Sequence, residues 1–121
     1  MSWANLDDRT WTDPVLGALS DRAFRLHINT YAYCADQLTD GQVDARQVAQ
    51  VAFMFQLTDA DEIKAAIREL VQAGVWTEDL NAYTLPSYIA ANRSRAEIEE
   101  DRRKNRERQA AWQKKQRRRR A

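Results

Sequence analysis

Residues 59–85, DADEIKAAIRELVQAGVWTEDLNAYTL, decide the fold that the sequence predicts. Asp59 can cap a helix whose apolar residues recur at the i, i+3, i+4 and i+7 spacing of one buried face. The residues on this face are Ile63, Ala66, Ile67, Leu70 and Val71. Gly74 is expected to end the helix. Apolar and polar residues then alternate over 75–77 and 82–85, on either side of a polar connector, which predicts a β-hairpin.

Two further helices are expected upstream of this stretch. Ser20 can cap the first, because its hydroxyl can accept from a free amide of the first turn, and Asp40-Gly41 gives the turn that ends it. Its broad apolar face predicts a largely buried helix. The residues of that face are Ala23, Phe24, Leu26, Ile28, Tyr31, Ala32, Cys34, Ala35 and Leu38. A short extended piece at 42–43 and a second helix over about 45–53, capped by Asp44, complete the series.

The order helix, short strand, helix, helix, hairpin is that of a winged helix-turn-helix. We therefore expect a mainly α fold with a small β-hairpin, with the winged helix-turn-helix domain at residues 1–86. One core should hold Phe24, Ile28, Tyr31, Ile67, Leu70 and Trp76. Residues 87–121 are predicted to form a long, charged, basic C-terminal helix or tail, which would reach ~50 Å if it were fully helical from Ser87. Its last part, 113–121, is expected to be disordered because six like charges repel there.

Charge is distributed very unevenly along the 121 residues. Residues 1–91 contain six basic and 13 acidic side chains, so they carry −7. Residues 92–121 contain 13 basic and five acidic side chains, so they carry +8, and the sum is the formal net charge of +1. An acidic body with a strongly basic tail indicates a polyanion or an acidic partner for the tail.

The composition also argues against several classes of protein. No apolar run approaches the ~20 residues of a membrane helix, and the first residues do not resemble a signal peptide. His27 and Cys34, the single histidine and cysteine, are too few for the usual zinc sites. Along a helix they would lie about 10 Å apart, too far for a nucleophile and its base, so His27 is interpreted as a packed or partly exposed side chain. We expect no cofactor, no metal, no enzymatic activity and a cytoplasmic location.

Two parts of the chain are candidate nucleic-acid contacts. The third helix would be the recognition helix if the domain reads DNA, although its two basic and four acidic residues leave it at −2. Groove reading and protein docking by this helix therefore both stay open. The predicted contacts on the body are Arg46, Lys64, Arg68 and Gln72.

The tail gives the stronger signal, because its cations would surround a helix and meet phosphates at many angles. Trp112 stands alone among polar residues, where an indole can stack on a base or fill a partner pocket. The alternative is a helix that only keeps the chain in solution. The predicted tail contacts are Arg93, Arg95, Arg102, Arg103, Lys104, Arg106, Arg108, Trp112, Lys114, Lys115, Arg117, Arg118, Arg119 and Arg120.

Several motifs resemble a known family. They are Trp3, Leu6-Asp7-Asp8, Trp11, Asp13-Pro14, the stretch 35–41 (ADQLTDG) and the stretch 70–76 (LVQAGVW) before a short hairpin and a basic tail. This layout is similar to small winged-helix proteins of actinobacteria and their phages, which resemble the N-terminal domains of phage replication initiators and replisome organisers. One departure is Val15-Leu16-Gly17 after Pro14, where family members often carry a basic residue.

The resemblance implies a DNA-binding protein of phage or prophage type that acts in replication initiation or gene regulation. The alternative is an adaptor, whose acidic winged helix docks a protein of the replication or transcription machinery while the tail holds nucleic acid. Tyr88, Ile89 and Ile98 leave a homodimer open.

Overall fold

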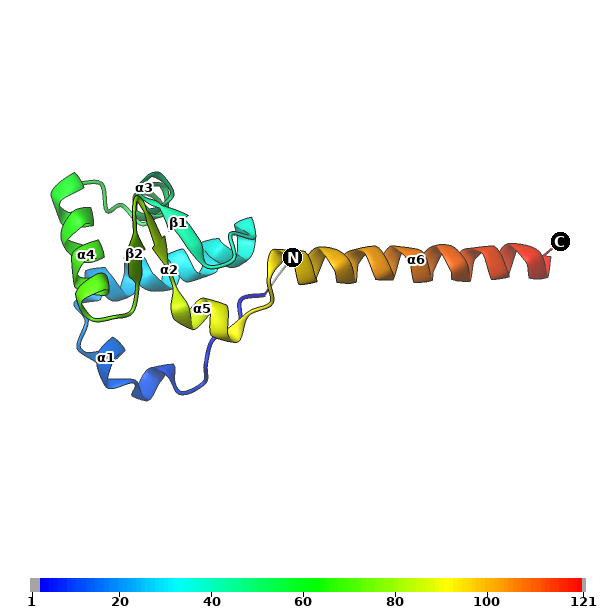
Figure 1. Ribbon diagram of the computed structural model, residues 1–121, viewed down its shortest axis with the longest axis horizontal. Coiled ribbons are helices and arrows are strands. Elements are labelled where there is room, and N and C mark those ends of the chain that lie inside the picture. The colour runs from blue at the N-terminus through cyan, green and yellow to red at the C-terminus, as the bar shows by residue number, and fades with distance from the viewer. Residues whose placement is uncertain (1–2, 121) are drawn as a thin grey trace.

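The computed structural model describes residues 3–120 and has the predicted architecture, a mainly helical winged helix-turn-helix followed by a long C-terminal helix (Figure 1). The elements in chain order are the 3-10 turn η1 (Thr10–Thr12), α1 (Pro14–Gly17), α2 (Asp21–Gln37), β1 (Gln42–Asp44), α3 (Ala45–Met54), α4 (Ala60–Gln72), β2 (Thr77–Asp79), β3 (Ala82–Thr84), α5 (Pro86–Ala91) and α6 (Arg95–Arg120).

The predicted caps begin the helices of the body. Ser20 Oγ accepts from the Ala23 amide at 3.2 Å at the start of α2. Asp44 begins α3 and exchanges two hydrogen bonds with Gln47, while Asp59 accepts from two amides of the first turn of α4. Satisfying these free amides fixes where each helix starts.

The hairpin joins the early extended piece in one antiparallel sheet of order β1-β3-β2. Tyr83 on β3 lies opposite Val43 on one side and Glu78 on the other. The hairpin begins two residues later than predicted, since the amides of Val75 and Trp76 both donate to the Leu70 carbonyl and so belong to the end of α4.

The core lies between α2, α3, α4 and the sheet, and of the predicted core residues it lacks Phe24 and Ile28 on α2. Tyr31, Ile67, Leu70 and Trp76 are buried, as predicted, and Ile28 is half-buried. Phe24 is 38% exposed, so its placement in the core is wrong; Ala32 is exposed as well. Phe24 is left uncovered because it borders an open cavity between α2 and the N-terminal segment.

His27 is packed inside this core, in agreement with the structural role expected for it. Its Nδ1 accepts a hydrogen bond from Trp76 Nε1 at 3.0 Å, which joins α2 to the start of the hairpin. Burial lowers the pKa of His27 to about 4, because desolvation penalises the charged imidazolium. The neutral ring is therefore the form that the fold requires.

Stability should fall as the pH drops from about 6.5 to about 4. The unfolded chain binds a proton at His27 in this window and the folded chain does not, so acidification favours unfolding. The expected loss at pH 4 is roughly 3 kcal/mol. Urea titrations across this range should show the loss in the wild type and a smaller one in His27→Asn, which keeps an acceptor near Nδ1 but does not titrate. Equal pH dependence in both proteins would contradict a buried neutral His27.

The C-terminal part has the long helical segment that was predicted, divided at Asn92 into α5 and α6. Asn92 leaves the helical conformation, with φ −122° and ψ 154°, and ends α5. Tyr88 on α5 is 4% exposed and packs into the core. Tyr88 is therefore not available for the homodimer contact that Tyr88, Ile89 and Ile98 left open. α6 continues to Arg120 across the segment predicted to be disordered; Ala121 lies outside the described residues.

Candidate nucleic-acid interface

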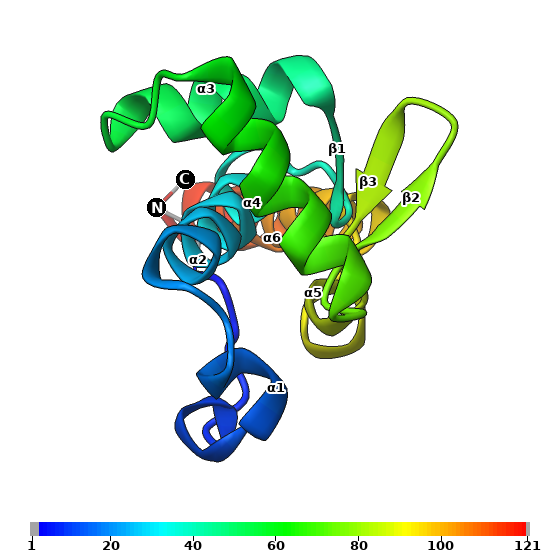
Figure 2. The same cartoon turned by 90° about the vertical axis from the view of Figure 1, so that its left-hand side faces the viewer.

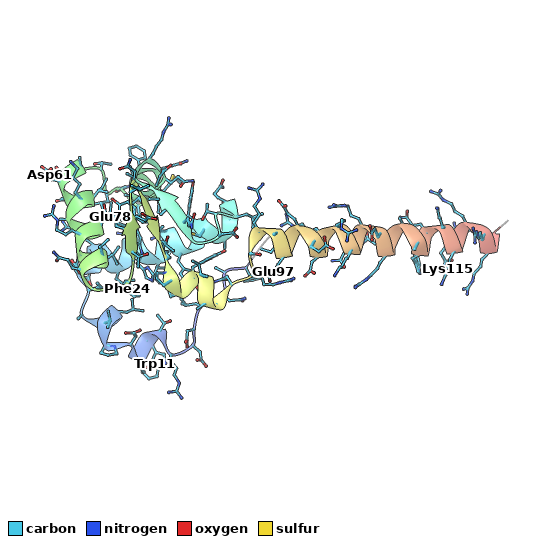
Figure 3. The ribbon with its side chains drawn as sticks, in the orientation of Figure 1. Trp11, Phe24, Asp61, Glu78, Glu97 and Lys115 are labelled. Carbon is cyan, nitrogen blue, oxygen red and sulfur yellow. The ribbon has the colours of Figure 1, made fainter. Side chains whose placement is uncertain are left out.

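Helix α6 projects from the body as a rod (Figure 1). It has 26 residues, none of them buried, and at ~1.5 Å per residue it extends about 39 Å. Figure 3 shows its side chains radiating on all sides into solvent, from Glu97 near the body to Lys115 near the far end. Such a rod can present its cations to phosphates over its whole length.

A set of hydrogen bonds at the α5–α6 junction holds this rod against the body. Asn92 Oδ1 accepts from the Asn5 amide at 2.7 Å, and Asn92 Nδ2 donates to the Tyr31 hydroxyl at 2.8 Å. Asp40 Oδ1 accepts from the Arg95 amide at 2.5 Å, at the first residue of α6. These contacts tie α6 to the N-terminal segment and to the turn after α2.

Asn92 and Ser94 are positioning residues that sequence reasoning missed. Ser94 Oγ accepts from the Glu97 amide at 3.1 Å and so begins α6. The spacing Ser94-x-x-Glu97 is an N-terminal helix signature and could have revealed this start. The hydrogen-bond partners of Asn92 are Tyr31 and Asn5, which lie 61 and 87 residues away along the chain. No local sequence pattern could predict these contacts.

Ion pairs neutralise the part of the tail nearest the body. Arg93 pairs with Asp101, and Arg95 pairs with Glu99 at 2.9 Å. Arg103 binds both Glu100 and Glu107. The hydrogen bond to Arg103 lowers the pKa of the Glu100 carboxyl, because it favours the charged form of this acid.

The unbalanced charge therefore gathers in the far half of the tail. Residues 93–107 contain six basic and five acidic side chains and carry +1, whereas residues 108–120 contain seven basic and no acidic side chains and carry +7. Ten tail cations have no ion pair within residues 3–120. They are Arg102, Lys104, Arg106, Arg108, Lys114, Lys115, Arg117, Arg118, Arg119 and Arg120.

The body brings three of its four predicted contacts together. Lys64, Arg68 and Gln72 line one side of a groove of about 400 Å³ between α4 and the hairpin, with Glu78 and Tyr83 on the other side. Figure 2 shows α4 beside the hairpin that forms this groove. Arg46 lies on the exposed surface of α3 and does not line the groove.

Carboxylates lie on both elements that form this groove and oppose phosphate binding there. Asp61 and Glu62 are exposed in the first turn of α4, and Glu78 and Asp79 are exposed on β2. Glu69, on the same helix, helps to hold the fold together, because its carboxylate accepts from the amide and hydroxyl of Ser20 at 2.6 and 2.8 Å. The shape of this face would therefore allow α4 to enter a DNA groove, but its acidic residues would repel the phosphates.

The structure also describes the surroundings of Cys34 and of the possible metal ligands. Cys34 is a buried free thiol, and burial raises its pKa, which disfavours the reactive thiolate. Across residues 3–120 no three His, Cys, Asp or Glu side chains are grouped to hold a metal ion. In the same part of the chain, no helix is both long and apolar enough to cross a bilayer.

Comparisons of the chain with protein-family models, with curated proteins and with solved structures find no match.

Proposed function

We propose that this chain is a DNA-binding protein whose helix α6 supplies most of its affinity without regard to sequence. The observation that carries the proposal is the set of ten tail cations that have no ion pair among residues 3–120, displayed on a projecting helix beside a body of charge −7. Phosphate neutralisation by such cations drives sequence-independent binding through counterion release. The setting we propose is cytoplasmic, in replication initiation or gene regulation of the phage or prophage type.

Binding of the full chain to a random-sequence duplex at several salt concentrations tests this proposal. Each phosphate neutralised adds about −0.9 to the slope of log affinity against log salt. With about four to six cations in contact at once, we expect a slope near −4 to −5. A slope near zero, or no binding at low salt, would contradict the proposal.

The groove between α4 and the hairpin supports a second, weaker contribution, which is sequence reading. If α4 enters the major groove, Lys64→Ala and Arg68→Ala should each weaken binding to a selected sequence by ~1–3 kcal/mol. Both should leave binding to random duplex nearly unchanged, because α6 is intact. Selection of a preferred sequence from a random pool, followed by affinity measurements on both duplexes, checks this. Unchanged binding of the double variant to the selected sequence would favour the adaptor function.

The adaptor function has its own support in the surface of the body. Phe53 and Met54, at the end of α3, are 67% and 81% exposed, and the surrounding body is acidic. Adjacent exposed apolar side chains are typical of protein contacts. In this function the winged helix docks a protein while α6 holds nucleic acid. If the winged helix without α6 binds a protein partner and adds nothing to DNA affinity, the chain is an adaptor.

A further inference from the structure

The N-terminal segment forms an acidic, apolar cavity with the start of α2. Helix α1 lies apart from α2 (Figure 2), and residues of the segment, of α1 and of α2 line an open cavity of about 550 Å³. Leu6, Trp11 and Phe24 supply apolar walls, and they are 51%, 87% and 38% exposed. A cavity of this size, with aromatic walls open to solvent, is typical of a binding site.

The charge of the cavity is entirely negative. Asp7, Asp8 and Asp21 are among its lining residues, and no lysine or arginine of residues 3–120 lines it. The complementary ligand is therefore an apolar or aromatic group flanked by cations. Charge complementarity of this kind steers a partner and fixes its register.

Helix α6 carries such a group near its far end. Trp112 is 63% exposed and is the only large apolar side chain after Ile98. Arg108 and Lys115 lie at i−4 and i+3 from it, so they occupy the same helix face, one turn to either side. An indole between two cations matches an aromatic cavity bordered by carboxylates.

A chain cannot place its own Trp112 in its own cavity while α6 remains a straight helix. Trp112 lies 17 residues beyond Arg95, roughly 26 Å along a helix that leads away from the body. Figure 1 shows α1 and α6 on different sides of the junction, with α6 directed away from the body. The occupant that fits is the tail of another copy.

We propose that Trp112 of one copy inserts between Trp11 and Phe24 of a second copy, while Arg108 and Lys115 face the carboxylates around the cavity. The interface joins two different surfaces, so it is heterologous and can extend into rings or chains. It does not depend on DNA binding, although both would draw on the cations around Trp112. DNA in excess should therefore disperse the assemblies.

Sedimentation velocity without nucleic acid at low salt tests the interface. The full chain should show species heavier than the monomer that diminish as salt is raised. Trp112→Ala removes the inserted group and Trp11→Ala removes a wall, so each variant alone should sediment as a monomer. Trp3→Ala is the matched control, because Trp3 is 82% exposed and does not line the cavity; it should associate like the wild type.

Mixing the two monomeric variants gives the sharpest outcome. Trp11→Ala keeps an intact tail and Trp112→Ala keeps an intact cavity, so together they can make one contact and no more. The mixture should contain a one-to-one dimer that neither variant forms alone. A mixture that stays monomeric, or a wild type that is monomeric at low salt, would overturn the proposal.

The same variants separate this inference from the proposed function. At protein concentrations too low for self-association, Trp11→Ala should bind duplex DNA with the affinity and salt dependence of the wild type, since α6 is untouched. Loss of self-association with DNA binding retained supports the interface. Normal self-association by a chain that binds no DNA would refute only the proposed function.

Discussion

Deleting residues 112–121 should roughly halve the dependence of DNA affinity on salt. The deletion removes six of the ten tail cations that have no ion pair within residues 3–120, together with the exposed indole of Trp112. If about four to six phosphates are contacted by the full chain, the slope of log affinity against log salt should change from near −4 or −5 to about −2. At low salt this corresponds to an affinity loss of orders of magnitude.

Fluorescence anisotropy on one labelled duplex, at four or more salt concentrations, measures this change. A matched control is a chain with Glu99→Gln, Glu100→Gln and Glu107→Gln, which frees Arg95 and Arg103 from their carboxylate partners. That control should bind more tightly and with a steeper slope than the wild type. A truncated chain with the affinity and slope of the full chain would mean that the tail is a spectator.

The largest expected effect on stability is that of Ile67→Ala, a loss of about 2–5 kcal/mol in the free energy of unfolding. Ile67 is 9% exposed on the face of α4 that packs into the core. The substitution removes buried apolar surface and leaves a cavity that its neighbours fill only in part. Ile89→Ala is the control, since Ile89 is 52% exposed; urea denaturation should show a much smaller loss for it. A loss below about 0.5 kcal/mol for Ile67→Ala would contradict this packing.

The helices of the body could be predicted because their signals are local. Ser20, Asp44 and Asp59 each accept a hydrogen bond from an amide no more than three residues further on. The residues next to each cap were therefore sufficient to predict where the helix begins. The helical spacing of the apolar residues on α4 also predicted burial correctly for Ala66, Ile67 and Leu70. Periodicity fails where a face has nothing to cover it. Phe24 has the spacing of a core residue, but the N-terminal segment stands off from α2 and leaves it exposed.

The division of the tail required contacts that the sequence does not display. Helix α5 ends and the tail helix α6 follows at Asn92, whose hydrogen-bond partners Asn5 and Tyr31 lie 87 and 61 residues earlier in the chain. Counting charges along the sequence predicted the whole set of tail cations as candidate contacts for nucleic acid. The structure divides that set, because Arg93, Arg95 and Arg103 are paired with carboxylates one or two turns away. On the body, Lys64, Arg68 and Gln72 share a groove, while Arg46 lies apart from it.

Removing the same charge from two places tests most directly whether α6 binds DNA. One variant carries Lys64→Gln and Arg68→Gln on α4, and the other carries Lys114→Gln and Lys115→Gln on α6; each loses two positive charges. Binding through α6 predicts that the α6 variant lowers the steepness of the salt slope on random duplex by about one, while the α4 variant keeps the slope of the wild type. A reduced slope for the α4 variant with an unchanged slope for the α6 variant would place DNA binding on the winged helix instead.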